Sequence, residues 1–425
     1  IIAAILAHLL LIPLRWLLNR TIKRHNLPYS ATTAQWVWAV FGLAMLWKLG
    51  GMIYPHIRVF DEAAHTLRVQ WLLQGRFAEL YFPNYTSFMG ATVGIEGGYL
   101  PYSPLWYIVT APFRLLGLPI GDTMNGLSAI LDVSKGIMIF VIGLATMRRE
   151  RSALMAMGLY HLFPMPYYLL SWGNYPTQFG LWAALLATTY LILNYDHLMQ
   201  KRTFMWWIAL VALCMATYTV IGVIAWTMLI FVALFELVRR SKRVRGVAKA
   251  IILGIIAAEV LMLAIYHIHF VPVVLNNTIP ALFSSAQSKG ATLPEQADDP
   301  RDTPLLNVQA NTSFMRNHTT DIMLIAMFAG IATLFIERTT RRWWTIWAAW
   351  LGIFIFYGIV SAFVADMVLK HIFFIMPLMC LGLAWLVELT MERFWASRWI
   401  VVASTIALIL LTLDRWHFYL LIKRH

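Results

Sequence analysis

Apolar residues fill long blocks that recur from one end of the chain to the other, with short polar stretches between them. A helix of about 20 apolar residues crosses the roughly 30 Å of hydrocarbon in a bilayer. The first block lacks the small-residue cleavage site of a signal sequence and precedes a basic loop, so it is interpreted as a span. We predict about twelve transmembrane helices, near residues 1–18, 33–55, 122–147, 153–172, 177–195, 203–217, 218–238, 248–275, 321–337, 343–364, 369–388 and 399–420.

Residues 203–238 are the least regular of these blocks. The run is too long for one span and too short for two full ones. We place a break near Tyr218, which gives two short helices that meet at the outer face.

Residues 56–121 interrupt the alternation of span and loop. Their first part is predicted to be an amphipathic helix at the membrane interface, because polar residues occupy the faces between regularly spaced apolar ones. The second part, residues 102–118, is apolar but short and contains two prolines, so it is predicted to be another juxtamembrane helix. The apolar positions of the first helix are Phe60, Ala64, Leu67 and Trp71.

Residues 276–320 form a second long interruption. This segment is polar, contains prolines and has no clear periodicity, so it is predicted to be a flexible loop over the outer face. No internal repeat and no separate soluble domain is evident along the chain.

Composition agrees with a membrane protein. Hydrophobic residues make up 60% of the 425 residues and charged residues only 12%, a balance that excludes a soluble domain of this length. Two cysteines, Cys214 and Cys380, lie inside apolar blocks, which does not suggest a disulfide framework.

The formal charge of +13 is concentrated in alternate loops, as the positive-inside rule expects of cytoplasmic connections. We therefore expect these loops to face anionic membrane lipids, and we expect no nucleic-acid partner. If residues 102–118 crossed the membrane, the basic loops would change sides, so the charge pattern favours the juxtamembrane interpretation. The basic residues are Arg20, Lys23, Arg24, Arg148, Arg149, Arg151, Arg239, Arg240, Lys242, Arg243, Arg245, Arg338, Arg341 and Arg342.

Two adjacent carboxylates, Asp61 and Glu62, stand where the chain leaves the span 33–55. One interpretation is structural, because carboxylates in the first turn stabilise a helix by roughly 0.3–1 kcal/mol. The other is functional, because carboxylates at a membrane boundary are costly unless they contact water or are used. Adjacent helical residues diverge by about 100°, so the two cannot both address one atom.

The order of elements resembles that of the GT-C glycosyltransferases, which include protein O-mannosyltransferases, aminoarabinose transferases and oligosaccharyltransferase catalytic subunits. FDEAAH follows a span, and GGYLPYSPLWYIVTAPFRLLGL opens a second juxtamembrane helix. GDTMNGLSAILDVSKGIMIFVIGLATMRRER is similar to the helix that ends in a basic cytoplasmic turn, and KHIFFIMPLMCLGLAWLVEL to a late helix of many members. The resemblance covers about residues 33–400 and implies an all-α polytopic membrane fold.

The resemblance also implies the domain organisation. The chain would be a single membrane domain, 1–425, in which 1–32 adds a span and a cytoplasmic loop to the usual pattern. The core would occupy 33–247 with its juxtamembrane helices in 56–121. The remaining spans would occupy 248–425 with the outer loop 276–320.

A GT-C enzyme would transfer a sugar, with inversion, from a polyprenyl-phosphate donor to a lipid, glycan or protein acceptor on the extracytoplasmic side. The resemblance makes Asp61 the general base; Glu62 would orient the acceptor or hold a divalent ion, Mg²⁺ or Mn²⁺. No other cofactor is implied. The expected location is a bacterial plasma membrane with the site facing outward, with the endoplasmic reticulum as the alternative.

Cationic residues near the outer face are the candidates for binding the donor phosphate. Lys370 and His371 begin the late span, although interfacial snorkelling would also explain them. Arg68 lies two helical turns after Asp61 on the same face, and Arg316 and His318 precede the span at 321. The candidates for the substrate pocket are His65, Tyr99, Tyr102, Asn174, Tyr175 and Gln178.

Other interpretations remain open. Asp132 and Lys135 lie in mid-membrane at i, i+3 and are expected to neutralise each other as a structural pair. A transporter or flippase for a lipid-linked sugar would explain intramembrane charges but leaves the juxtamembrane helices unexplained. A non-catalytic subunit that keeps the GT-C fold within a larger membrane complex is the other alternative.

Overall fold

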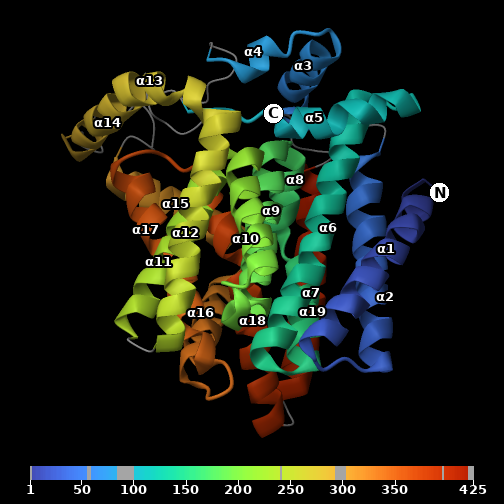
Figure 1. The fold of residues 1–425 in the computed structure, drawn as a ribbon. Coiled ribbons are helices and arrows are strands. Elements are labelled where there is room, and N and C mark those ends of the chain that lie inside the picture. Colours follow the sequence, from blue (N-terminus) through green and yellow to red (C-terminus); the bar gives the residue numbers. More distant parts are fainter. Residues whose placement is uncertain are drawn as a thin grey trace.

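The computed structural model describes residues 2–54, 59–83, 100–239, 242–291, 303–394 and 397–419. These residues form a bundle of helices without a strand (Figure 1). In chain order the α-helices are α1 (Ile2–His25), α2 (Ala31–Met52), α3 (Glu62–Leu73), α4 (Ala78–Tyr81), α5 (Leu105–Thr110), α6 (Ile120–Met147), α7 (Glu150–Leu162), α8 (Pro164–Trp172), α9 (Tyr175–Leu193), α10 (Lys201–Thr217), α11 (Thr219–Val238), α12 (Lys242–Ile265), α13 (Val271–Val273), α14 (Ile279–Ala291), α15 (Pro304–His318), α16 (Asp321–Ile336), α17 (Trp344–Phe363), α18 (Lys370–Arg393) and α19 (Ser397–His417). Shorter helical turns are η2 (Ala111–Leu116), η3 (Tyr195–His197), η4 (His267–His269), η5 (Val274–Thr278) and η8 (Arg341–Trp343).

Seven helices in the described part of the chain are long and apolar enough to cross a membrane, or eight if the bent pair α15–α16 counts as one span. The chain is therefore a multi-pass membrane protein. The seven are α6, α9, α11, residues 246–265 of α12, residues 341–363, α18 and residues 398–417 of α19.

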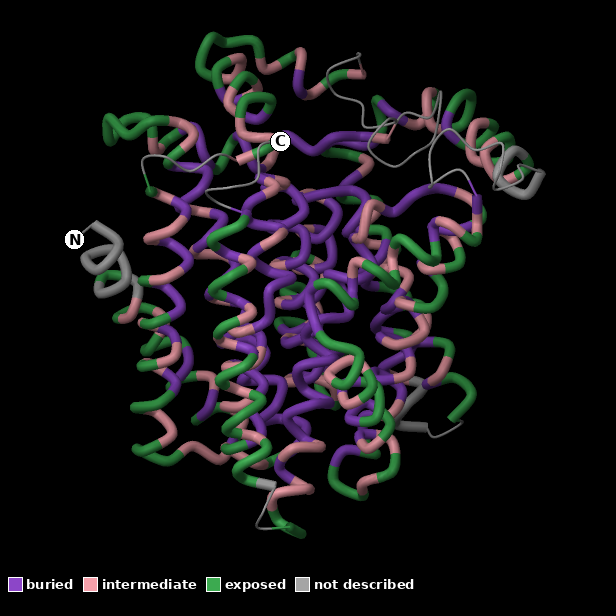
Figure 2. The backbone as a smooth tube through the Cα atoms, turned by 180° about the vertical axis from the view of Figure 1, so that it is seen from behind, coloured by how far each residue is buried: buried purple, intermediate pink, exposed green. Residues whose placement is uncertain are grey.

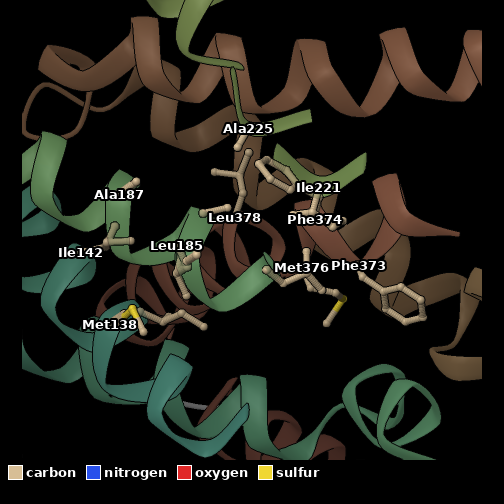
Figure 3. Packing of buried hydrophobic residues seen from close by; sticks show 14 of the residues in the cluster. Met138, Ile142, Leu185, Ala187, Ile221, Ala225, Phe373, Phe374, Met376 and Leu378 are labelled. Carbon is tan, nitrogen blue, oxygen red and sulfur yellow. The ribbon is translucent and has the colours of Figure 1, made fainter. Parts of the chain in front are cut away.

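Helices α6, α9 and α18 form the centre of the bundle. In each of them 78% of the most apolar window is buried, whereas in α19 only 17% is, so α19 lies at the periphery. Buried backbone accordingly concentrates in the middle of the bundle (Figure 2). Side chains from the three central helices interdigitate there, among them Met138, Leu185 and Leu378 (Figure 3).

The predicted break in residues 203–238 is confirmed, because α10 ends at Thr217 and α11 begins at Thr219. The predicted span 153–172 is instead two helices, α7 and α8. Pro164 begins α8 and Phe163 before it is extended, as residues that precede proline usually are.

The prediction of a flexible loop over 276–320 is wrong in its described parts, since α14 and α15 are helices. Ile279, Leu282 and Phe283 stand at helical spacing in α14, a short period that the surrounding polar residues obscured. Pro304 occupies the first turn of α15, where its missing N–H costs nothing. Residues 292–302 lie outside the described part of the chain.

Helices α3, α4 and α5 lie across one end of the bundle (Figure 1). Phe60, just before α3, and Leu67 are exposed, while His65 and Val69 are buried toward the protein. Glu62 and Arg68 are partly buried, so together with His65 three polar side chains of α3 can contribute to a site beneath this helix.

Candidate active site

The backbone of the acidic pair is fixed by the turn that follows α8. The Asp61 N–H donates to the Trp172 carbonyl at 3.0 Å. Gly173 ends α8 in the left-handed region, at φ 71°. A Cβ at Gly173 would overlap a methyl carbon of Val59, so glycine is needed both for the turn and for the close approach of the chain.

Asp61 is the N-cap residue of α3, yet its side chain makes no capping hydrogen bond. Burial raises the pKa of this carboxyl to about 6, although the charges of Arg68 and Lys370 oppose the shift. A base with a pKa near the working pH is well matched to accepting a proton. The missing cap and the raised pKa both argue against a purely structural role for Asp61.

Glu62 is held against α6, and its partner there is oriented from α9. The Asn125 amide donates to its carboxylate at 3.0 Å, and Asn125 in turn accepts a hydrogen bond from the Tyr175 hydroxyl at 2.7 Å. A Cβ at Gly121 would overlap a Glu62 oxygen, so any larger residue at this position would displace the carboxylate. Burial raises the pKa of Glu62, with the Asn125 hydrogen bond opposing the shift.

Aromatic and basic side chains form the wall beside Asp61. The Arg68 guanidinium stacks 4.5 Å over the Tyr102 ring and donates to the Tyr107 hydroxyl at 3.4 Å. The same hydroxyl lies 2.8 Å from His65 Nδ1. Burial, with the nearby Arg68 charge, lowers the pKa of His65 to about 3, so this imidazole is neutral at physiological pH and serves to place Tyr107.

Lys370 reaches the same site from α18, far along the chain. It is buried, with its ammonium 5.9 Å from the centre of the Tyr218 ring, and its charge acts on Asp61. The structure therefore brings together three predicted residues, Asp61, Arg68 and Lys370. One carboxylate and two cations meet at the end of the bundle that α3 and α5 cover.

Comparison by sequence finds no matching family model and no matching curated protein. Comparison by structure finds the oligosaccharyltransferase AglB from Archaeoglobus fulgidus in complex with an inhibitory peptide and a dolichol-phosphate. The TM-score is 0.55 at 13% identity, over 92% of this chain and 56% of that one. The Archaeoglobus fulgidus oligosaccharyltransferase in complex with Zn and sulfate gives a TM-score of 0.56 at 12% identity, over 90% and 53%.

The chain has a GT-C fold. It spans about half the length of the archaeal oligosaccharyltransferases that it matches. The protein O-mannosyltransferase complex Pmt1-Pmt2 of S. cerevisiae, bound to the sugar donor, gives a lower TM-score of 0.41 at 18% identity, over 57% of this chain and 34% of that one.

Within this GT-C fold, three predicted phosphate ligands lie in other surroundings. His371 packs its ring against Phe354 on α17. Arg316 makes a two-pronged ion pair with Asp321, at 2.7 and 2.9 Å. His318 bonds to the Phe314 carbonyl at 2.7 Å and contacts the Tyr419 hydroxyl. Their partners lie within α15, α16, α17 and the C-terminal segment.

Some of the predicted pocket residues lie at the site and others lie elsewhere. Tyr175 is buried, stacks on Trp106 with centroids 5.6 Å apart, and packs edge-on against His65. Asn174 caps α9 by accepting from the Thr177 N–H at 3.3 Å. Gln178 points into the bundle, where it accepts a hydrogen bond from Lys135. Tyr99 lies outside the described residues.

The intramembrane pair is a larger network than predicted. Lys135 does pair with Asp132, at 2.8 Å, but Lys48 of α2 lies still closer, at 2.6 Å. The Tyr160 hydroxyl donates to the same carboxylate at 2.7 Å, and Lys135 donates to Gln178 at 2.7 Å. The network ties α2, α6, α7 and α9 together below the site.

Sequence reasoning missed several of these residues. Lys48 carried a signal, since a lysine inside an apolar span needs a partner. Asn125 carried a weaker one, as a polar residue near the outer end of the span 122–147. Tyr107 and Tyr218 carried none, because interfacial tyrosines are common in membrane proteins.

Proposed function

We propose that this protein transfers a sugar from a polyprenyl-phosphate donor to an acceptor, with Asp61 as the general base. The observation that carries the proposal is a half-buried carboxyl whose pKa is raised to about 6, flanked by two cations in a GT-C fold. The dolichol-phosphate in the archaeal complex supports a polyprenyl-phosphate donor.

The chemistry follows from these groups. Asp61 accepts the proton of the acceptor as the acceptor oxygen attacks the anomeric carbon from the side opposite the phosphate. The bond between that carbon and the phosphate oxygen breaks, its electron pair leaves with the phosphate, and the configuration inverts. Lys370 and Arg68 stabilise the charge that develops on the leaving phosphate, so no acid is needed there.

Glu62 has a separate role in this proposal. Its carboxylate is oriented by Asn125 and would position the acceptor. The described residues contain no group of three or more His, Cys, Asp or Glu side chains that could hold a metal ion. Mg²⁺ is often bound by one or two carboxylates together with substrate phosphates, so Glu62 could hold an ion that the donor completes.

Removal of the Lys370 charge should weaken donor binding. Charged hydrogen bonds contribute about 1.5–3 kcal/mol, so Lys370→Ala should raise the apparent KM for the donor by about tenfold or more. Lys370→Arg, which keeps the charge, should retain most of the affinity. Steady-state kinetics over a range of donor concentrations measures both. An unchanged KM in Lys370→Ala would indicate that Arg68, and not Lys370, binds the donor phosphate.

We further propose twelve spans, with α3 and α5 at the outer face of a bacterial plasma membrane or, alternatively, on the lumenal side of the endoplasmic reticulum. In the bacterial case, Gln74→Cys should react with an impermeant thiol reagent on intact cells, and Thr339→Cys only after permeabilisation. Both positions are exposed, and the native Cys214 and Cys380 are buried, so background labelling should be low. Labelling of Thr339→Cys on intact cells would show that the end of the bundle opposite α3 and α5 faces outward.

A further inference from the structure

A cavity of about 390 Å³ opens at the end of the bundle opposite Asp61. The two sites lie at the two ends of α6, whose 28 residues span about 42 Å at 1.5 Å each. Segments far apart in the sequence converge on the cavity: the α1–α2, α6–α7 and α9–α10 connections and η8 before α17. The cavity is therefore created by the fold and is not a gap within one loop.

The lining of this cavity is positively charged. Arg24, Arg148 and Arg342 line it, and Asp196 is the one carboxylate among the described residues of the lining. Asp196 pairs with Arg342 at 2.9 Å, so the arginines keep a formal excess of two positive charges. Arg148 donates to the Asn26 carbonyl at 3.0 Å, which fixes its guanidinium at the rim.

The fixed positive charge of the lining comes from its arginines, which stay protonated at every physiological pH. Burial, together with the charges of Arg24 and His197, lowers the pKa of His25 on the same wall. Arginine presents a planar fork of N–H donors that matches phosphate geometry. The lining thus combines fixed charge and phosphate-binding groups.

The cavity continues toward the lipid-facing surface. A second cavity of about 230 Å³ shares Arg24 and Thr203 with the first and adds Arg202, Tyr190 and Trp206 to the lining. Trp206 is 59% exposed on α10, as a tryptophan at a membrane–water boundary would be. A ligand in the polar cavity can therefore extend an apolar part along the outside of the bundle.

We propose that this cavity binds a phosphate group, supplied by the headgroup of an anionic lipid. Basic pockets between membrane helices at this kind of boundary bind such headgroups. A free phosphate ester shares the chemistry, but the adjoining second cavity, which the exposed Trp206 lines, favours the lipid. Because the site joins four chain segments and exists only in the folded protein, a bound ligand stabilises the folded state, and the stabilisation grows with the logarithm of the ligand concentration above its Kd.

The concentration of basic residues in these loops does not by itself distinguish Arg24 and Arg342 from other basic residues nearby. Lys23 and Arg341 are sequence neighbours of Arg24 and Arg342, are exposed, and do not line the cavity. They provide a matched control, because the two pairs remove the same charge from the same loops.

The experiment compares the full chain, Arg24→Gln/Arg342→Gln and Lys23→Gln/Arg341→Gln, purified in a neutral detergent. Phosphatidylglycerol or phosphatidylcholine is titrated into mixed micelles, and binding is measured by thermal shift and by native mass spectrometry. We expect each cavity arginine that contacts the headgroup directly to contribute about fivefold, so the cavity pair should weaken phosphatidylglycerol binding roughly thirtyfold. The control pair should bind nearly as the parent does, and phosphatidylcholine should bind weakly to all three.

Inorganic phosphate and glycerol 3-phosphate form the second arm. If either compound raises the melting temperature at the concentrations at which the lipid does, and that increase is lost only in the cavity pair, the cavity is a phosphate site whose ligand is soluble. Equal losses in the cavity and control pairs, or none in either, would overturn the proposal. If the double variant does not fold, Arg24→Gln against Lys23→Gln repeats the comparison with roughly a fivefold expected effect. Turnover is not the readout, so the result is independent of the proposed function.

Discussion

Asp61→Asn should lower turnover by about 10²–10⁴ with donor affinity nearly unchanged, because loss of general-base assistance costs about that much. Asparagine keeps the shape of the side chain but cannot accept the proton of the acceptor. Lys370 and Arg68 would remain in place to bind the phosphate. Single-turnover rates and donor binding, measured on the same preparation, separate the two effects.

The pH dependence provides a second readout of the same residue. Only the ionised carboxylate can act as a base, so the parent rate should rise as the pH passes through about 6 and level off above it. In Asp61→Asn this rise should be absent from the residual rate. A parent profile that is flat between pH 5 and 8 would contradict the assignment.

Stability distinguishes this role from helix capping. The pKa of Asp61 in the folded protein lies above its ordinary value of 3.8, so the folded state favours the protonated form. Ionisation of this carboxyl therefore costs stability as the pH rises from about 4 to about 6, and Asp61→Asn avoids that cost. We expect the variant to melt no lower than the parent at pH 7, whereas loss of an N-cap would cost about 0.5–2 kcal/mol.

Glu62→Gln is the matched control, since it changes the neighbouring carboxylate by the same chemistry. The introduced amide would keep an oxygen for the Asn125 hydrogen bond, so the rate should fall less than in Asp61→Asn. If a divalent ion binds there, added Mg²⁺ or Mn²⁺ should partly restore the activity. Normal turnover in both variants would end the catalytic proposal and favour a non-catalytic subunit with the GT-C fold.

The sequence predicted the helices better than the site, for a physical reason. Helix positions follow from apolar blocks and breakers, which are local, and the break at Tyr218 was found in this way. The predictions failed where a short period was hidden among polar residues, as in α14, or where a proline split one apolar block, as at Pro164.

The site itself depends on contacts between distant segments. Asp61 and Arg68 share a helix face and could be paired from their spacing, but the approach of Lys370 depends on how α18 packs against the rest of the bundle. His371 stands next to Lys370 in the sequence yet turns toward α17. From the sequence alone, Lys370 and His371 were therefore equally good candidates for the phosphate site, and only the packing of α18 distinguishes them.

A substitution in the buried network below the site should lower the stability of the folded protein strongly. Asp132→Asn would leave Lys48 and Lys135 facing each other without a counter-charge, in a place that water does not reach. Removing one partner of a buried ion pair typically costs about 3–5 kcal/mol, because the remaining charge is uncompensated. Chemical and thermal unfolding in one detergent would measure the loss, with Asp414→Asn, 74% exposed at its side chain, as the control.

A compensated variant tests whether charge imbalance is the cause. Replacing Lys48, Asp132 and Lys135 together by Met, Leu and Met removes every charge and should recover much of the stability, since buried ion pairs are often replaceable by apolar groups of similar volume. Tyr160→Phe should cost about 1.5–3 kcal/mol, the contribution of one hydrogen bond to a charged group. If Asp132→Asn is as stable to unfolding as Asp414→Asn, the charges of Lys48 and Lys135 do not need the carboxylate. The network would then hold the four helices together by hydrogen bonds alone.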